Sequence, residues 1–184
     1  MYLKIELPCF VHFLASSDAT KSSFLSRTDF NNSLYMMQKY SRPVDILLIE
    51  DNPGDVRLTQ EAFREARIPI KISVSMDGED ALAFLKRTSP YENAIRPDLI
   101  LLDLNIPKRD GREVLAEIKA DALLRNIPVV VLTTSNAEQD IQKTYNLQVN
   151  AYINKPVDFD HFLDIVHKIE EFWLMTAILP SNTK

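Results

Sequence analysis

The sequence predicts an α/β fold in which helices cover both faces of a five-stranded parallel sheet. Five apolar runs of strand length alternate along the chain with segments of helical periodicity. This alternation calls for parallel strands that are joined by right-handed crossovers. The runs are apolar at almost every position, as at residues 44–49, so each strand is expected to be buried on both sides.

The elements are expected in regular order after residue 43. Strands are predicted over residues 44–49, 70–74, 99–102, 129–132 and 151–153. Helices are predicted from the turn at 52–55 to about residue 66, and over about 80–86, 112–119 and 138–145. A longer loop is expected at 87–96, and Asp158 suits the N-cap of a long last helix.

Length and composition predict one domain with an amino-terminal extension. The 184 residues are 46% hydrophobic, which is enough for a real core, and a second domain is not expected to fit. Residues 1–43 are expected to be disordered or to come from a start site placed too far upstream. Residues 44–180 are expected to form the domain, and 181–184 a tail.

Charge and residue usage exclude several functions. The net charge of −5 is a poor match to a nucleic acid backbone, so no direct nucleic acid binding is expected. The single Cys9 excludes a disulfide framework and suits a reducing cytoplasm. Three isolated glycines rule out the P-loop and the dinucleotide-binding glycine pattern. The apolar stretch at 7–15 is too short to span a bilayer, so no membrane association is expected.

Three of the apolar runs end in residues that together describe a charged site. Glu50 and Asp51 follow the first run, Asp103 follows the third, and Lys155 follows the fifth. Carboxyl ends of adjacent parallel strands share one edge of a sheet, where open α/β sheets place their ligands. Three carboxylates at one edge require a cation, and Mg²⁺ prefers oxygen ligands of this kind. The pattern predicts a site for a divalent metal and a phosphoryl group.

These residues resemble the receiver domain of two-component response regulators. Thr133 lies 30 residues after Asp103, and Lys155 lies 22 after Thr133, which are spacings typical of a receiver. The nine residues that begin with Asp103 also follow the family's pattern. Two segments, 50–59 and 172–180, narrow the resemblance to the small response regulators associated with cyanobacterial phytochromes.

The resemblance implies a flavodoxin-like three-layer sandwich with strand order 2-1-3-4-5. It also implies that Asp103 takes a phosphoryl group from a phosphohistidine of a sensor histidine kinase, of phytochrome type by the narrower resemblance. Lys155 and the hydroxyl of Thr133 would bind the phosphoryl oxygens. The protein would then be a cytoplasmic single-domain response regulator in a phosphorelay. It would not be an enzyme beyond self-catalysed phosphorylation and dephosphorylation.

The resemblance assigns further roles around this site. Asp51, Asp103 and the backbone carbonyl of Asn105 would bind Mg²⁺ directly, with Glu50 acting through water. Tyr152 stands where the family carries an aromatic residue that changes rotamer when the phosphoryl-bound threonine moves. The alternative for Tyr152 is a half-buried strand aromatic without a switching role.

Some positions depart from the commonest receiver pattern or depend on the resemblance alone. Thr134 stands where receivers usually carry Ala or Gly, and its branched side chain is expected to narrow access to the phosphorylation site. Asn105 and Ser135 occupy positions that tune dephosphorylation in the family. Pro156 resembles the family proline that follows a cis peptide bond.

The last helix carries two apolar stripes. The first is expected to face the sheet and consists of Phe159, Phe162, Leu163, Val166, Ile169 and Trp173. The second consists of Ile165, Phe172 and Leu179, which recur at seven-residue spacing. Together with the resemblance to dimeric phytochrome response regulators, it predicts a homodimer. The face would be made by the helix at 138–145, the strand at 151–153 and the last helix. The alternative is one wide core-facing stripe with the helix end folded back on its own domain.

Two other functions remain open from the sequence. A Mg²⁺-dependent phosphohydrolase of the haloacid dehalogenase type also forms an aspartyl phosphate, but it carries Asp-x-Asp where this chain has Asp103-Leu104-Asn105. A pseudo-receiver would bind a partner without phosphorylation. Retention of Asp51, Asp103, Thr133 and Lys155 argues against it.

Overall fold

The computed structural model describes residues 42–135 and 137–180. Its elements are β1 (Val44–Ile49), α2 (Pro53–Arg64), β2 (Ile70–Ser75), α3 (Gly78–Lys86), β3 (Leu99–Leu102), α4 (Gly111–Ala120), β4 (Val129–Thr133), α5 (Glu138–Asn146), β5 (Ala151–Asn154), α6 (Phe159–Ile169) and the π-helix η1 (Glu170–Thr176). Residues 1–41 of the expected extension and the expected tail at 181–184 lie outside the described residues.

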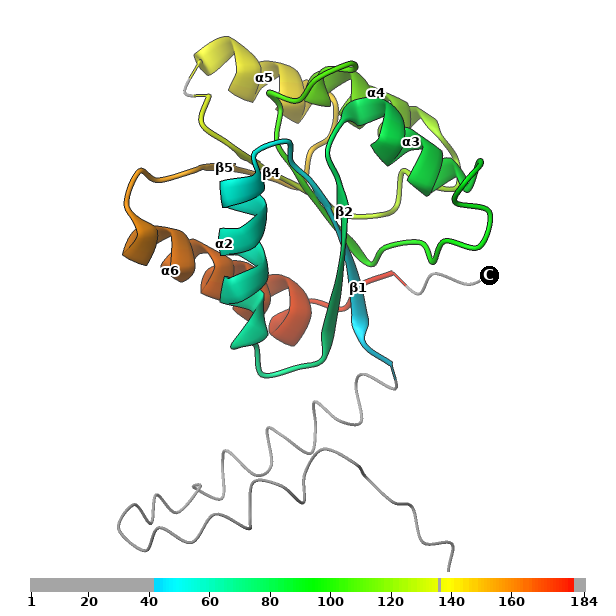
Figure 1. Cartoon of the computed structure of the whole chain (residues 1–184). Helices are drawn as coiled ribbons and strands as arrows, with labels where there is room; N and C mark the ends of the chain where they lie inside the picture. Colours follow the sequence, from blue (N-terminus) through cyan, green and yellow to red (C-terminus); the bar gives the residue numbers. More distant parts are fainter. Residues whose placement is uncertain (1–41, 136, 181–184) are drawn as a thin grey trace, which may run out of the picture. The chain divides into compact units, whose positions relative to one another are not determined.

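The five strands form one parallel sheet in the order β2-β1-β3-β4-β5, which confirms the predicted fold (Figure 1). The register aligns the carboxyl ends of neighbouring strands. Ile49 of β1 lies opposite Ser75 of β2 and Leu102 of β3, and Leu102 lies opposite Val131 of β4. The residues that follow β1 and β3 therefore emerge side by side at one edge of the sheet.

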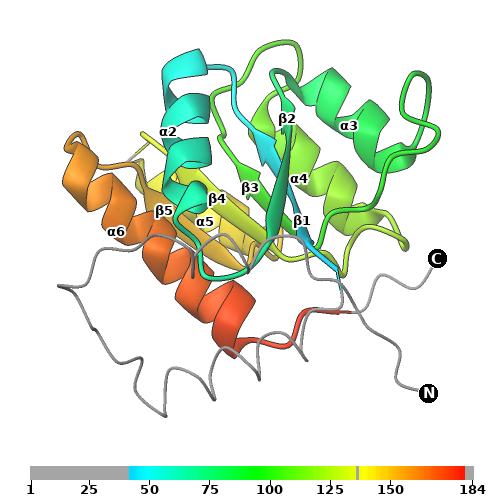
Figure 2. The same ribbon diagram turned by 60° about the horizontal axis from the view of Figure 1, so that its bottom comes forward.

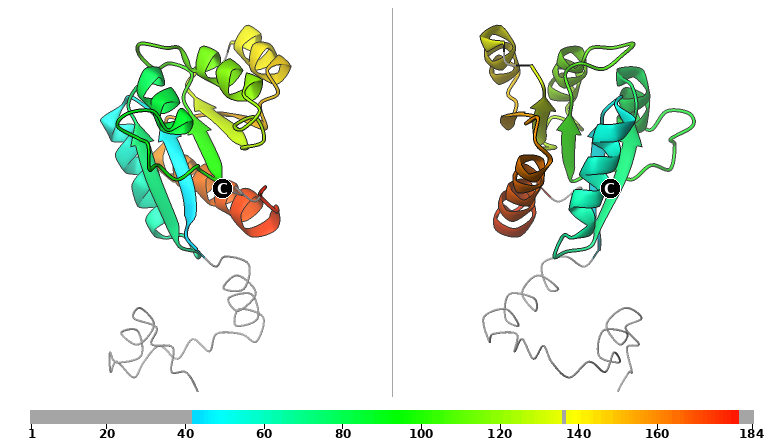
Figure 3. Two further views of the ribbon diagram at one scale, coloured as in Figure 1. Left: turned by 90° about the vertical axis from the view of Figure 1, so that its right-hand side faces the viewer. Right: turned by 60° about the vertical axis from the view of Figure 1, so that its left-hand side comes forward.

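Two apolar cores lie on the two faces of the sheet. One contains residues of α3 and α4, and the other contains residues of α2, α6 and η1. Figure 2 shows α2 and α6 on one side of the sheet with α3 and α4 on the other, and Figure 3 shows the same layers from two further directions. Leu47 of β1 faces the first core and Leu48 the second, as expected for a strand buried on both sides.

The starts of the helices are fixed next to the carboxyl edge of the sheet. Four helices begin after side chains that accept backbone N–H bonds, namely Asn52 for α2, Asp77 for α3, Asp110 for α4 and Asp158 for α6. The prediction of an N-cap at Asp158 is confirmed. Helix α5 differs, because its N-cap residue is Ala137, which has no side-chain oxygen.

The last helical segment differs from the single long helix that the sequence predicted. The α-helix ends at Ile169, and η1 continues with π-helical geometry, in which the N–H of Ala177 donates to the carbonyl of Phe172 at 2.7 Å. This wider turn changes which residues face the sheet. Leu174 is fully buried, whereas Phe159, predicted to face the core, is 48% exposed. The prediction for Phe159 was wrong because it occupies the first position of α6, at the rim of the domain.

The predicted second stripe is also altered. Phe172 is 56% exposed, but Ile165 and Leu179 are partly buried against the core of their own domain. Leu179 lies beyond η1, so the seven-residue repeat does not continue on one helix. The ring of Phe172 packs edge-on against Trp173, with ring centroids 5.1 Å apart. The chain end is thus partly folded back on its own domain.

Two smaller observations complete the description. Among the described peptide bonds only Ser89–Pro90 is cis, so the expectation of a cis bond before Pro156 was wrong. No helix in the described ranges is long and apolar enough to span a bilayer.

Candidate functional site

The ammonium group of Lys155 lies among three carboxylates at the carboxyl edge of the sheet. Lys155 follows β5, and its backbone N–H donates to the carbonyl of Thr133 at 2.8 Å. Its Nζ donates to Asp103 Oδ2 at 2.6 Å, to Asp55 Oδ2 at 2.9 Å and to Glu50 Oε2. The side chains of Lys155, Glu50 and Asp103 are each less than a tenth exposed. One positive charge therefore faces three acidic groups, of which water hardly reaches Glu50 and Asp103.

The pKa values of the buried pair follow from this environment. Burial raises the pKa of Glu50 above its ordinary value, and the hydrogen bond from Lys155 only partly opposes this effect. Burial would lower the pKa of Lys155, but the hydrogen bonds to Asp103, Asp55 and Glu50 outweigh it and raise the pKa above its ordinary value. Lys155 therefore stays charged at neutral pH, and Glu50 binds a proton more readily than an exposed carboxyl does.

Asp103 is held by the tight loop that follows β3. Its Oδ1 accepts the backbone N–H of Asn105 at 2.9 Å, and its own N–H donates to the carbonyl of Ile49 at 2.9 Å. Gly111, at the start of α4, returns to this loop so closely that a Cβ there would lie 2.3 Å from the carbonyl oxygen of Asp103. Only glycine allows this approach, which fixes the Asp103 main chain against α4.

Only some of the predicted site residues are in direct contact in the structure. Glu50, Asp103 and Lys155 are in direct contact, whereas the side chains of Asp51 and Asn105 are exposed at the same edge. In the described ranges, no group of three or more His, Cys, Asp or Glu side chains is arranged as a metal site. The carboxylates of Glu50 and Asp103 instead share the ammonium of Lys155.

Asp55 was not predicted as a site residue. The sequence assigned it only to the start of the first helix, yet its carboxylate lies 2.9 Å from the Lys155 ammonium. Its position in the first turn of α2, which begins three residues beyond Glu50, could have indicated this contact. An acid in that turn points back toward the strand end that precedes the helix.

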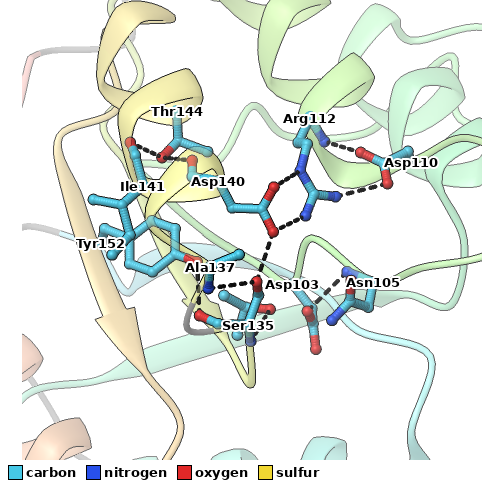
Figure 4. A network of polar contacts seen from close by, with 11 residues as sticks. Asp103, Asn105, Asp110, Arg112, Ser135, Ala137, Asp140, Ile141, Thr144 and Tyr152 are labelled. Carbon is cyan, nitrogen blue, oxygen red and sulfur yellow. Dashed lines mark hydrogen bonds and ion pairs between the residues drawn. The ribbon is translucent and has the colours of Figure 1, made fainter.

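Thr133 and Tyr152 each contact Ser135 in the loop that follows β4. Thr133 is fully buried, and its Oγ1 accepts the backbone N–H of Ser135 at 3.4 Å. The hydroxyl of Tyr152 donates to the carbonyl of Ser135 at 2.9 Å (Figure 4). The ring of Tyr152 packs against the core that contains α3 and α4. Burial raises the pKa of Tyr152. Both predicted switch residues thus contact the same residue.

A small cavity of about 180 Å³ lies beside Lys155. It is lined by Asp55, Leu58, Thr134, Lys155, Pro156, Val157, Asp158, Phe159 and Phe162. Thr134 therefore lies next to Lys155 at the wall of this cavity. That its branched side chain narrows access to the phosphorylation site stays a prediction.

The fold and the arrangement of these residues define the class of protein. The response regulator receiver domain family matches residues 46–167, and the chain belongs to this family. Among its relatives is the response regulator Rcp1 of Synechocystis sp. (strain ATCC 27184 / PCC 6803 / Kazusa). Rcp1 is 48% identical over 146 residues, which are 79% of this chain and 99% of the relative.

Solved structures of similar proteins support the same assignment. The phosphorylated cyanobacterial phytochrome response regulator RcpA is 54% identical, with a TM-score of 0.75 over 76% of this chain and 100% of RcpA. The Mn²⁺-bound form of Rcp1 is 50% identical, with a TM-score of 0.74 over 76% of this chain and 100% of Rcp1. Response regulator RPA3017, from red light signaling of R. palustris, is 30% identical, with a TM-score of 0.70 over 75% of this chain and 99% of that chain.

Proposed function

We propose that the protein is a response regulator that accepts a phosphoryl group on Asp103 from a sensor histidine kinase. The observation that carries this proposal is the contact of Asp103 Oδ2 with the Lys155 ammonium at 2.6 Å, while Oδ1 accepts the N–H of Asn105. This orients a buried carboxylate and places a cation where charge develops on a phosphoryl group. For phosphoryl transfer, Lys155 must exchange at least one carboxylate contact for a phosphoryl oxygen. The hydroxyl of Thr133 would bind another.

The proposal includes Mg²⁺, because the acidic groups exceed the one ammonium among them. Asp51, Asp103 and the carbonyl of Asn105 would hold the ion, and Glu50 would act through water. All four supply oxygen, the donor that Mg²⁺ prefers, so the residues fit this ion. When bound, Mg²⁺ neutralises charge on the entering phosphoryl oxygens. The Mn²⁺-bound structure of the relative Rcp1 supports the inclusion of a divalent ion.

The kinase partner is proposed to be of phytochrome type and to act in the cytoplasm. Support comes from the relatives, since RcpA is described as a cyanobacterial phytochrome response regulator and RPA3017 belongs to red light signaling. The output would be a changed surface rather than an enzymatic product. A protein that folds but never accepts phosphate would instead support the pseudo-receiver hypothesis.

Phosphate mapping tests this proposal. We expect incubation with a small phosphodonor and Mg²⁺ to label Asp103 alone, and Asp103→Asn or chelation of the metal to abolish labelling. Asp164→Asn, an exposed acid on α6, is the matched control and should be labelled like the wild type. Phosphate on another residue, or undiminished labelling of Asp103→Asn, would refute the assignment.

A homodimer through α5, β5 and α6 remains part of the proposal. Its support is that Phe172, in η1 directly after α6, is 56% exposed, although Ile165 and Leu179 contact their own core. We expect light scattering to show a dimeric wild type and a folded, monomeric Phe172→Glu variant. Leu123→Glu, which changes another exposed apolar residue, should stay dimeric. A wild type that is monomeric at micromolar concentration, with and without phosphorylation, would rule out the dimer.

A further inference from the structure

Arg112, in the first turn of α4, connects two helices by paired hydrogen bonds. Its Nε donates to Asp140 Oδ1 at 2.9 Å, and its Nη2 lies 2.5 Å from Asp140 Oδ2, in the first turn of α5 (Figure 4). Its Nη1 donates to Asp110, the N-cap residue of α4, at 2.8 Å. The side chains of Arg112 and Asp140 are 23% and 16% exposed. Two parallel bonds to a mostly buried carboxylate form a more rigid contact than a surface ion pair does.

Asp140 also contacts the loop that follows β4. The hydroxyl of Ser135 donates to Asp140 Oδ2 at 2.6 Å, and the same hydroxyl oxygen accepts the N–H of Ala137 at 3.4 Å. Helix α5 has no cap from its own N-cap residue, so these bonds hold its start. The hydrogen bonds from Arg112 and Ser135 lower the pKa of Asp140, which keeps the carboxylate ionised and able to accept all of them.

Ser135 is also the residue that both switch candidates contact. Its N–H donates to the hydroxyl oxygen of Thr133 at 3.4 Å, and its carbonyl accepts the hydroxyl of Tyr152 at 2.9 Å. The side chain of Ser135 is therefore held by the network from α4, while its main chain contacts the residues beside the phosphoacceptor site. A shift of Ser135 would change both contacts together.

We propose that Arg112 is a positioning residue that acts on the phosphoacceptor site through Asp140 and Ser135. Arg112 fixes Asp140, Asp140 fixes the hydroxyl of Ser135, and the Ser135 main chain in turn holds Thr133 and Tyr152 in the positions seen here. The consequence for phosphoryl transfer rests on the proposed function of Asp103. The hydrogen-bonded connection from α4 to the loop that follows β4 is independent of that proposed function.

A double-mutant cycle separates this role from simple stabilisation between two helices. If Arg112 acts through Ser135, then Arg112→Met has an effect in the wild type but little further effect in Ser135→Ala. If the ion pair only joins α4 to α5, the two substitutions act independently and their effects add. Arg64→Met is the matched control, because it removes a 74% exposed arginine paired with Glu61 on α2, remote from this loop.

Hydrogen exchange of the full-length, unphosphorylated protein gives the first reading. Loss of one hydrogen bond to a charged group should speed exchange of the Ser135 and Ala137 amides by about tenfold in Arg112→Met. Ser135→Ala should show a similar increase, the double variant no more than Ser135→Ala, and Arg64→Met none. Additive effects in the double variant would overturn the proposal. Arg112→Lys keeps the charge without the paired donors and replaces Arg112→Met in the cycle if that variant does not fold.

The rate of labelling by a small phosphodonor gives the second reading. We expect labelling of Arg112→Met to be about tenfold slower than that of the wild type, with the same non-additivity in the double variant. Unchanged rates alongside faster exchange would overturn the positioning role. A wild type that accepts no phosphate would refute the proposed function, while the exchange experiment would still decide whether Arg112 acts through Ser135.

Discussion

In the described part of the chain, a cation contacts acidic side chains at both the amino and the carboxyl edge of the sheet, but the two ion-pair groups differ in their exposure to water. At the amino edge, Arg42 donates two bonds to Asp98, at 2.7 and 2.8 Å, and one to Asp45 at 2.9 Å. Asp98 also accepts the backbone N–H of Asp45. The Arg42 side chain is 47% exposed, so water reaches this ion pair.

At the carboxyl edge the same kind of arrangement is enclosed. Lys155 is 5% exposed and contacts Glu50, Asp55 and Asp103, of which only Asp55 is appreciably accessible. Here the carboxylates of Glu50 and Asp103 have little access to water, and a further acid, the exposed Asp51, follows Glu50 directly. Buried charges that lack full compensation are costly.

This difference separates a structural ion pair from a binding site. At the amino edge, the hydrogen bonds of Arg42 and its exposure to water stabilise the two carboxylates. The carboxyl edge keeps an uncompensated acidic group at the point where the sheet presents its ligand-binding edge. A divalent cation would compensate the carboxylates at this edge, and a phosphoryl group would be bound beside it. The poorly compensated charge therefore lies where the proposed function needs it.

The largest contrast should come from removing the cation at each edge. Lys155→Met leaves buried carboxylates without a partner and is expected to reduce the free energy of unfolding by about 3–5 kcal/mol at neutral pH. Arg42→Met removes a half-exposed cation and should cost about 1 kcal/mol. Urea denaturation of both variants measures the difference. Equal losses of unfolding free energy would show that the buried carboxylates at the carboxyl edge depend on their cation no more than those at the amino edge do.

Removing one acid from each edge should produce effects of opposite sign. In metal-free buffer, Asp103→Asn relieves repulsion and is expected to raise the free energy of unfolding by about 1 kcal/mol. Asp98→Asn loses charge-assisted bonds and should lower it by about 1–3 kcal/mol. Thermal and urea unfolding of the two variants test the signs. A destabilised Asp103→Asn protein would mean that Lys155 already compensates the site.

The sequence predicted the sheet and the strand-end acids because both depend on local patterns. Continuous apolar runs indicated buried strands, and each charged residue that ended a run stands at the carboxyl edge, as Asp103 and Lys155 show. Asp55 was missed because its contact with Lys155 joins residues 100 positions apart. The Arg112–Asp140 pair was missed for the same reason, since neither residue belongs to a motif.

The chain end was harder to predict for a different reason. Helical periodicity assumes a constant number of residues per turn, and the π-helical turn of η1 breaks that assumption after Ile169. Leu174 then faces the core, and Leu179 packs beyond the helix instead of continuing the stripe with Phe172. No residue pattern in the sequence marked this change in helix type.

The smallest expected effect concerns pH at the carboxyl edge. Burial raises the pKa of Glu50 above its ordinary value of 4.5, so the folded protein binds this proton more tightly than the unfolded chain does. The resulting stability is present at low pH and is lost as pH rises from 4.5 through the raised pKa. In metal-free buffer, wild-type stability should therefore fall more between about pH 5 and about pH 7 than that of Glu50→Gln. Glu61→Gln, which changes a half-exposed glutamate of α2, should follow the wild type. Urea denaturation across this pH range measures the slopes. Parallel curves for wild type and Glu50→Gln would show that Lys155 offsets the burial of Glu50 completely.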